Sequence, residues 1–318
     1  MTDVDQSQID RFAEFLPTLG GVKPFDFCGE AEGVLYPKRN SRGALEAFFF
    51  NASHQFGFWF LDGSRYGRPM IALAGGAQRK GSDFVFFCVQ RALNRDPDFF
   101  QPERLAALTD RECEAIFLDD SGRNPLPMWP EHKSILFDYA DWFVQNRTTP
   151  EALLIKANRA RKPLQYFLEA LREIPGYRED PLQKKAMLLA VILENRPEKF
   201  LHVSDPGSAV PIIDYHLQRS ALRTGLVTIP DENLRRKVAS RTLVSKEEEG
   251  TIRKATYKAV ELLVKKSGLS VAAIDFFFFT NRTRCPEMSE PKCAECPVQS
   301  ICKKQTGLFQ PVYRTTFY

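Results

Sequence analysis

Four cysteines near the C-terminal end of the chain constrain its local structure more than any other feature. Cys285, Cys293, Cys296 and Cys302 lie within 18 consecutive positions, in the spacing C-x7-C-x2-C-x5-C. Four thiolates in one short segment can surround a compact centre, either Zn²⁺ or an iron–sulfur cluster. A structural zinc ribbon usually offers two separated C-x-x-C pairs, whereas this segment has one such pair flanked by single cysteines. The spacing therefore predicts a metal site, which we expect to act as a structural staple.

The rest of the composition indicates an ordinary soluble globular protein. Hydrophobic residues make up 43% and charged residues 26% of the 318 positions. The acidic, polar segment 1–10 does not read as a signal peptide, and apolar runs such as 186–193 are too short to span a bilayer. Cys28, Cys88 and Cys113 stand singly and are expected in the core. We therefore expect a cytoplasmic protein without a membrane partner, where disulfides are rare.

Helical periodicity dominates the chain, with a small β-containing portion near the N-terminus. Alternating aromatic and β-branched residues predict short strands within 44–61 and 69–74. Helices are predicted over 6–16, 81–93, 102–118, 131–145, 150–160, 163–174, 181–194, 210–222, 231–240, 246–266 and 270–280. The predicted fold class is mainly α, divided into residues 1–122 with the small sheet, a helical body over 123–280, and the cysteine segment with the tail over 281–318.

The segment 211–225 contains the strongest catalytic candidate. Asp214 follows two isoleucines and opens a predicted helix, so it is either an ordinary N-cap or a carboxylate facing a cavity. The segment resembles the glycosylase motif V-D-x-H-V-x-R of the helix-hairpin-helix superfamily, with Asp214, His216 and Arg219 in register. The resemblance implies that Asp214 stabilises positive charge on a sugar as an N-glycosidic bond breaks, and activates water. We expect His216 and Arg219 to be packing or scaffold groups.

Two further segments resemble parts of the same superfamily. The cysteine spacing is similar to the iron–sulfur loop of the endonuclease III family, whose first gap has six residues, and implies a [4Fe–4S] cluster with zinc as the alternative. The segment 181–189 resembles the second helix of the hairpin motif. Lys184 falls where bifunctional relatives carry a Schiff-base lysine; a solvated helix lysine is the alternative. The hairpin glycines are absent, and two acids with one base separate the first two cysteines, which weakens phosphate binding.

A broader resemblance spreads over most of the chain, from about residue 48 to about residue 279. The matching pieces are Phe56-Gly-Phe58-Trp59, Gly81, Gln90-Arg91-Ala92-Leu93, Asp120-Ser121-Gly122, Glu131, Lys184-Lys185-Ala186, Asp214-Tyr215 and Arg253. Their order is similar to that in the queuosine salvage family, the queuosine 5′-phosphate N-glycosidases, whose fold is related to DNA glycosylases. The resemblance implies that Phe56, Phe58 and Trp59 hold a flat base, with core packing as the alternative.

Several positions depart from that family's pattern. Ala52 and Gln55 replace an aspartate and an asparagine, and Ser82-Asp83 replaces an aromatic pair. We interpret His54 and Asp83 as an altered set that reads the base edge. The cysteine segment is itself foreign to the salvage family.

These motifs predict an N-glycosidase that hydrolyses a modified purine-like nucleotide or nucleoside of the 7-deazaguanine or queuosine type. Asp214 and Lys184 are its catalytic candidates, Lys184 or Arg253 is expected at a phosphate or sugar oxygen, and Tyr215 is a further candidate for substrate binding. Two alternatives remain: an iron–sulfur DNA glycosylase, and a non-catalytic nucleic-acid-binding protein on the same scaffold. The net charge of +4 permits contact with DNA without requiring it. The sequence leaves the base, the sugar and the oligomeric state open.

Overall fold

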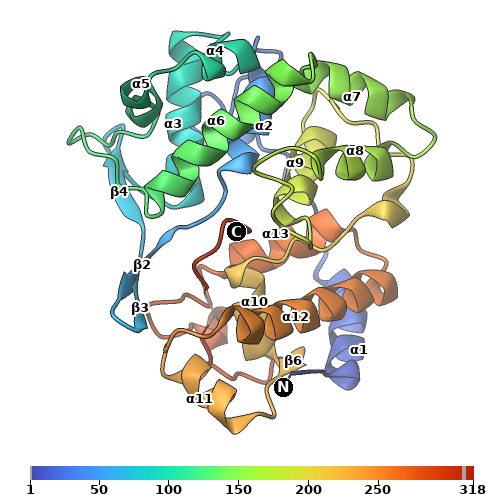
Figure 1. Cartoon of the computed structure of the whole chain (residues 1–318). Coiled ribbons are helices and arrows are strands. Elements are labelled where there is room, and N and C mark those ends of the chain that lie inside the picture. Colours follow the sequence, from blue (N-terminus) through green and yellow to red (C-terminus); the bar gives the residue numbers. More distant parts are fainter. Residues whose placement is uncertain (1, 310–312) are drawn as a thin grey trace. The chain divides into compact units, whose positions relative to one another are not determined.

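The computed structural model describes residues 2–309 and 313–318. This part of the chain is mainly helical, with thirteen α-helices and six short β-strands, as the sequence predicts (Figure 1). The strands form three two-stranded sheets, β1 with β6, β2 with β3 and β4 with β5. No helix of the described residues has the length and apolarity needed to cross a membrane.

The bounds of the elements are as follows. The helices are α1 Gln6–Phe15, α2 Ala44–Ser53, α3 Ser82–Arg95, α4 Pro102–Ala106, α5 Asp110–Ile116, α6 Trp129–Gln145, α7 Pro150–Arg159, α8 Pro163–Leu171, α9 Lys184–Asn195, α10 Tyr215–Thr224, α11 Glu232–Ala239, α12 Lys246–Ser267 and α13 Val271–Asn281. The strands are β1 Asp3–Val4, β2 Trp59–Asp62, β3 Arg65–Pro69, β4 Ile71–Ala74, β5 Ala77–Lys80 and β6 Val227–Thr228.

Two sequence predictions differ from these elements. The first part of the segment predicted as strands, Ala44–Ser53, is the helix α2, and every one of its residues is buried. A helix buried on all sides carries no polar stripe, so its sequence shows no helical period. The helix predicted over 102–118 is two helices, because the Thr109 side chain accepts from the Glu112 backbone and begins a new helix with a capping box.

The chain forms two compact units that are interleaved along the sequence. The first unit contains Met1–Phe25, Leu61–Arg68 and Val210–Arg314, and the second contains Asp26–Phe60, Pro69–Ala209 and Thr315–Tyr318. The sequence analysis instead predicts three consecutive parts, divided after residues 122 and 280. Each unit takes segments from distant parts of the chain, so its core depends on long-range contacts.

The core of the first unit joins both ends of the sequence. Strand β1 pairs with β6 in antiparallel register, with Val4 opposite Val227. The buried side chains of α1, α10, α12 and α13 pack together, among them Ile9, Phe12, Leu217, Leu222, Ile252, Leu263, Ile274 and Phe278. This packing fixes the two ends of α10, which carries the candidate aspartate.

The core of the second unit surrounds α2 and is rich in aromatic rings. The Phe49 ring packs edge to face against that of Phe167 in α8, with 5.8 Å between the ring centroids, and the centroids of Phe50 and Phe100 are 4.9 Å apart. The Tyr177 hydroxyl donates a hydrogen bond to the carbonyl oxygen of Phe49. Much of the large phenylalanine content therefore serves core packing.

Replacing Gly43 should test how tightly α2 is seated. Gly43 caps α2 at φ 76°, and an added Cβ would lie 1.9 Å from the carbonyl oxygen of Pro97. We expect Gly43→Ala to lower the free energy of unfolding by about 3 kcal/mol, the sum of left-handed strain and overpacking. Gly29→Ala is the control, since Gly29 has φ 73° with open space around it, and should cost about 1 kcal/mol. Equal losses in urea titrations of the two variants would contradict this account.

Candidate functional site

Asp214 lies at the beginning of α10 and is its N-cap. Its Oδ1 accepts the backbone N–H groups of His216 at 2.7 Å and Leu217 at 3.0 Å. The described residues place no hydrogen-bond donor on Oδ2. One oxygen is therefore held by the helix while the other is available, so capping and catalysis are compatible in this carboxylate.

Two other predicted site residues lie beside Asp214 in the first unit. Arg253 of α12 is buried, and its Nε donates to the carbonyl oxygen of Ile213 at 3.1 Å. The Tyr215 ring lies 4.1 Å from the His216 ring, centroid to centroid. Arg253 thus fixes the peptide immediately before Asp214 and brings a positive charge to the beginning of α10.

The scaffold role expected for His216 and Arg219 agrees with their contacts. Arg219 is 1% exposed; its Nη2 lies 3.2 Å from His216 Nδ1 and 3.5 Å from Glu287 Oε2. Burial lowers the pKa of Arg219 to about 10, so the guanidinium stays charged at neutral pH. Glu287 is itself 3% exposed, so this acid of the cysteine segment is buried and neutralises Arg219 in the interior.

The four cysteines predicted to bind metal line one pocket. All four thiols are free of disulfides. The pocket has a volume of about 30 Å³, and its walls include Cys285, Cys293, Cys296, Cys302, Arg223, Asn281, Arg284 and Lys304. Segments 285–302 and the end of α10 therefore face a common space.

Three of the four sulfurs receive hydrogen bonds from N–H groups. Arg223 Nη1 donates to Cys285 Sγ at 3.3 Å, Asn281 Nδ2 to Cys296 Sγ at 3.5 Å, and the Lys304 amide to Cys302 Sγ at 3.3 Å. Such donors stabilise thiolates, the form in which cysteine binds metal. No group of three or more His, Cys, Asp or Glu side chains in the described ranges is arranged around a single ion.

The predicted base-binding side chains lie in the second unit and are buried. His54 and Phe56 are 0% exposed, and Phe58 and Trp59 are each 6% exposed. The Phe56 ring stacks on His132 of α6 at 4.0 Å. Asp83 lies in the first turn of α3 and is partly exposed. These four rings thus occupy packed positions; for Phe56, Phe58 and Trp59, core packing is the alternative that the sequence left open.

Two lysines at the beginning of α9 bind carbonyl groups at the end of α2 and just after it. Lys184 Nζ donates to the Gln55 carbonyl at 3.3 Å, and Lys185 Nζ to the Ser53 carbonyl at 3.0 Å. A helix leaves its last carbonyl groups without intrahelical partners, and positive charge is favourable there. Lys184 is only 6% exposed, so it is not a solvated helix lysine.

The sequence did not single out the cluster that surrounds Lys185. This lysine is 0% exposed, and burial lowers its pKa to about 7; its Nζ lies 4.9 Å from the centre of the Phe56 ring. The Nδ1 atoms of His54 and His132 lie 3.1 Å apart, and both Nε2 atoms are buried with no partner in the described part of the chain. Two adjacent lysines at the start of an apolar helix were the sequence signal for a buried amine. The sequence alone does not tell which of the two lysines is buried.

The candidate residues fall into two groups that belong to different units. The first unit holds Asp214, Tyr215, Arg253 and the four cysteines, and the second holds His54, Phe56, Phe58, Trp59, Asp83 and Lys184. No protein-family model matches this chain, and no curated protein matches it. The chemistry of these two groups is therefore the basis for a functional proposal.

The histidine pair should make stability depend on pH. Burial, with a smaller effect of Lys185, lowers the pKa of His132 from 6.5 to about 3, and burial with His132 lowers that of His54. The unfolded chain binds these protons first, so the stability that the pair contributes is fully present above pH 6.5 and is lost as the pH falls towards the lowered pKa values of the folded state, about 3 for His132. We expect a loss of about 1.4 kcal/mol per pH unit for each histidine.

Urea unfolding at several pH values measures this slope. His132→Gln should reduce the slope by about half, because one of the two buried groups no longer titrates. His202→Gln is the matched control, since His202 is exposed, and should leave the slope unchanged. An identical slope in His132→Gln and the wild type would rule out the pair as its source.

Proposed function

We propose that this protein is an N-glycosidase that uses Asp214 to hydrolyse the bond between a base and a sugar. The observation that carries the proposal is the geometry of this carboxylate. Its Oδ1 is held by two backbone N–H groups, at 2.7 and 3.0 Å, while Oδ2 receives no donor from the described residues. A group fixed on one side and available on the other suits stabilisation of a developing positive charge. The resemblance of the segment 211–225 to the glycosylase motif supports a helix-hairpin-helix glycosylase-like fold.

The proposed reaction follows from that geometry. The C1′–N bond breaks, its electron pair stays on the base nitrogen, and the sugar becomes oxocarbenium-like. The negative charge of Asp214 stabilises this cation and orients a water molecule. As the water oxygen bonds to C1′, its proton passes to Oδ2. Asp214 then gives up this proton to solvent and the base nitrogen takes one up, so the carboxylate is restored and the products are the free base and a sugar with a 1′-hydroxyl.

The proposed substrate is a modified purine-like nucleotide or nucleoside of the 7-deazaguanine or queuosine type. Support comes from the motif order shared with the queuosine salvage family. Of the residues that this resemblance implies at the base, Asp83 is partly exposed, whereas His54, Phe56, Phe58 and Trp59 are packed in the interior of the second unit. Arg253, which belongs to the same unit as Asp214, is the cation proposed for a phosphate or sugar oxygen, with Lys184 as the alternative. Tyr215 is a further candidate for substrate binding.

The four cysteines are proposed to hold a [4Fe–4S] cluster, with Zn²⁺ as the alternative. They fit such a group because all four line one pocket and three of their sulfurs receive N–H donors. A cluster needs thiolates on the walls of a space rather than converging on one ion. We assign the cluster a structural role, joining the segment 285–302 to α10.

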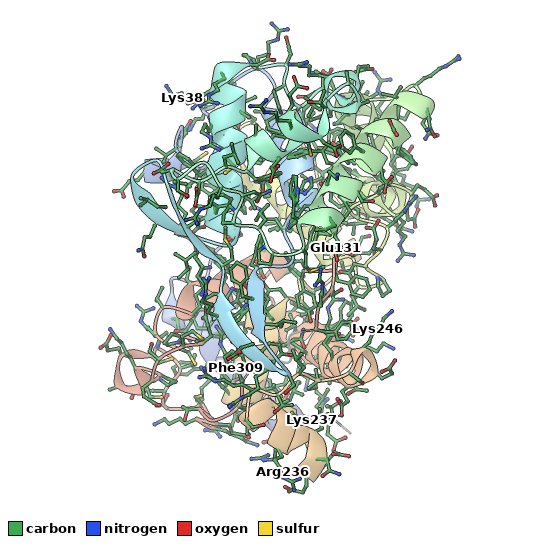
Figure 2. The ribbon with its side chains drawn as sticks, turned by 60° about the vertical axis from the view of Figure 1, so that its left-hand side comes forward. Lys38, Glu131, Arg236, Lys237, Lys246 and Phe309 are labelled. Carbon is green, nitrogen blue, oxygen red and sulfur yellow. The ribbon has the colours of Figure 1, made fainter. Side chains whose placement is uncertain are left out.

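A second candidate function is excision of a base from DNA. It is favoured by the burial of Glu287 against Arg219, which removes one of the two loop acids that counted against phosphate binding. Figure 2 shows Arg236 and Lys237 on α11 and Lys246 at the beginning of α12. However, Lys237 is bound to Glu248 at 2.6 Å, so this basic group is partly neutralised. The third possibility, a non-catalytic nucleic-acid-binding protein, requires no chemistry of Asp214.

Base release is the assay that separates these functions. Purified protein is incubated with queuosine 5′-phosphate and, in parallel, with duplex DNA that carries modified bases, and free base is measured by chromatography. We expect release from the mononucleotide and a loss of about 10²–10⁴-fold in Asp214→Asn, since one positioned carboxylate contributes that much. Asp231→Asn is the matched control, because Asp231 caps α11 in the same way. Release only from DNA would support the second candidate, and no release from either substrate would contradict both.

Metal analysis tests the cysteine site independently of activity. We expect about four iron atoms per chain after anaerobic purification, and a brown colour. Cys296→Ser should lose most of that iron, because a serine hydroxyl does not replace a thiolate ligand. Cys113→Ser is the control, since Cys113 is a buried thiol of the second unit. About one zinc per chain without iron would select the zinc alternative.

A further inference from the structure

Helix α10 connects the candidate aspartate to the cysteine pocket. The helix runs from Tyr215 to Thr224, with Asp214 as N-cap and Gly225 as C-cap. Ten residues of α-helix span about 15 Å. Its last turn contributes Ser220, Arg223 and Thr224 to the wall of the cysteine pocket. One rigid element therefore has the proposed catalytic group at one end and the proposed metal site at the other.

Arg223 binds the first part of the cysteine segment. It is 4% exposed, and its Nη1 donates to Cys285 Sγ at 3.3 Å and to the Pro286 carbonyl at 2.8 Å. Its Nε donates to the Leu308 carbonyl at 2.8 Å. A buried guanidinium requires acceptors in the plane of its fork, so these contacts fix the rotation of α10 about its axis.

The residues after the last cysteine bind the same turn from another side. The Lys303 amide donates to the Thr224 carbonyl at 3.2 Å, and the Gln305 amide to the Arg223 carbonyl at 2.9 Å. Carbonyl groups at the end of a helix have no intrahelical partner, so these bonds cap α10. Cys302 lies one residue before this cap. The end of α10 is thus attached to both ends of the cysteine segment.

The other half of α10 is held by a further link to the same segment. Arg219 lies one turn before Arg223 and pairs with Glu287, which lies between the first two cysteines. Arg219 Nη2 also lies 3.2 Å from His216 Nδ1, and the His216 amide donates to Asp214. Contacts therefore run without a break from Cys285 and Glu287 to the Asp214 carboxylate.

We propose that Arg223 is a positioning residue that couples occupancy of the cysteine site to the placement of Asp214. With the centre bound, the cysteine segment is fixed, and Arg223 and the cap at 303–305 hold α10 in one position. Without it, the segment loosens and α10 frays from its last turn towards Asp214. This inference rests on the proposed function, since it takes Asp214 as the catalytic group and the cysteines as metal ligands.

Amide hydrogen exchange tests the coupling without any assay of activity. We would measure protection of the His216 and Leu217 amides, which Asp214 holds, in the metal-loaded full chain and after treatment with a chelator. Removal of the metal should lower their protection by about tenfold or more, and Arg223→Gln in the loaded protein should do the same. Amides of α12 should keep most of their protection, because they are not attached to the cysteine segment through Arg223.

Two further variants separate positioning from general destabilisation. Arg223→Lys keeps one donor for Cys285 Sγ but loses the fork, so it should retain metal and show an intermediate loss of protection. Arg235→Gln is the matched control, since Arg235 is exposed on α11. Unchanged protection at His216 and Leu217 on metal removal would overturn the proposal. So would an equal loss over all amides of the first unit.

The same variants distinguish a failure of the coupling from a failure of the proposed chemistry. If the wild type releases no base but exchange at α10 follows metal content, the coupling stands and the reaction is wrong. If base release depends on Asp214 but amide exchange at α10 is the same with and without metal, the reaction stands and the coupling is wrong. With both intact, Arg223→Lys should lower kcat while KM changes little, because only the catalytic group is displaced.

Discussion

Two buried guanidinium groups on one face of α10 determine how the first unit is assembled. Arg219 and Arg223 are 1% and 4% exposed, and neither can remain in an apolar interior without acceptors. Arg219 pairs with the Glu287 carboxylate. Arg223 donates hydrogen bonds to Cys285 Sγ and to the carbonyl groups of Pro286 and Leu308. These acceptors all lie in or after the cysteine segment, so that segment folds onto α10. The candidate aspartate and the candidate metal site are consequently parts of one hydrogen-bonded assembly.

The second unit places charge in its interior for a different structural reason. Helix α2 is buried along its whole length, so its last carbonyl groups cannot turn to water. Lys185 of α9 supplies a donor to the carbonyl of Ser53, the last residue of α2, and Lys184 supplies one to the carbonyl of Gln55, two residues further on. Desolvation of Lys185 is the cost of that arrangement, and it leaves an amine with a pKa of about 7 beside two neutral histidines. Groups perturbed in this way are concentrated at functional sites, although structural caps also produce them.

The sequence predicts those features that depend on local spacing and misses those that depend on burial. Most helices follow their periodicity, and the four cysteines, which lie within 18 consecutive positions, share one pocket. The sequence left Asp214 either as an N-cap or as a carboxylate facing a cavity, and the structure shows that it is the N-cap of α10. Helix α2 was missed because both faces are apolar, which erases the helical period. Lys185, His132 and the inward position of Glu287 were missed because only tertiary packing decides which of several neighbouring polar residues is enclosed.

The interleaved order of the two units has a consequence for synthesis on the ribosome. Met1–Phe25 belongs to the first unit, but strand β1 finds its partner β6 only at Val227–Thr228. The apolar face of α1, with Ile9 and Phe12, therefore emerges some two hundred residues before α10 and α12, which cover it. The second unit, whose main segments end at Ala209, can collapse in the meantime. The apolar residues of this N-terminal segment are thus exposed during elongation until α10 and α12 have been made.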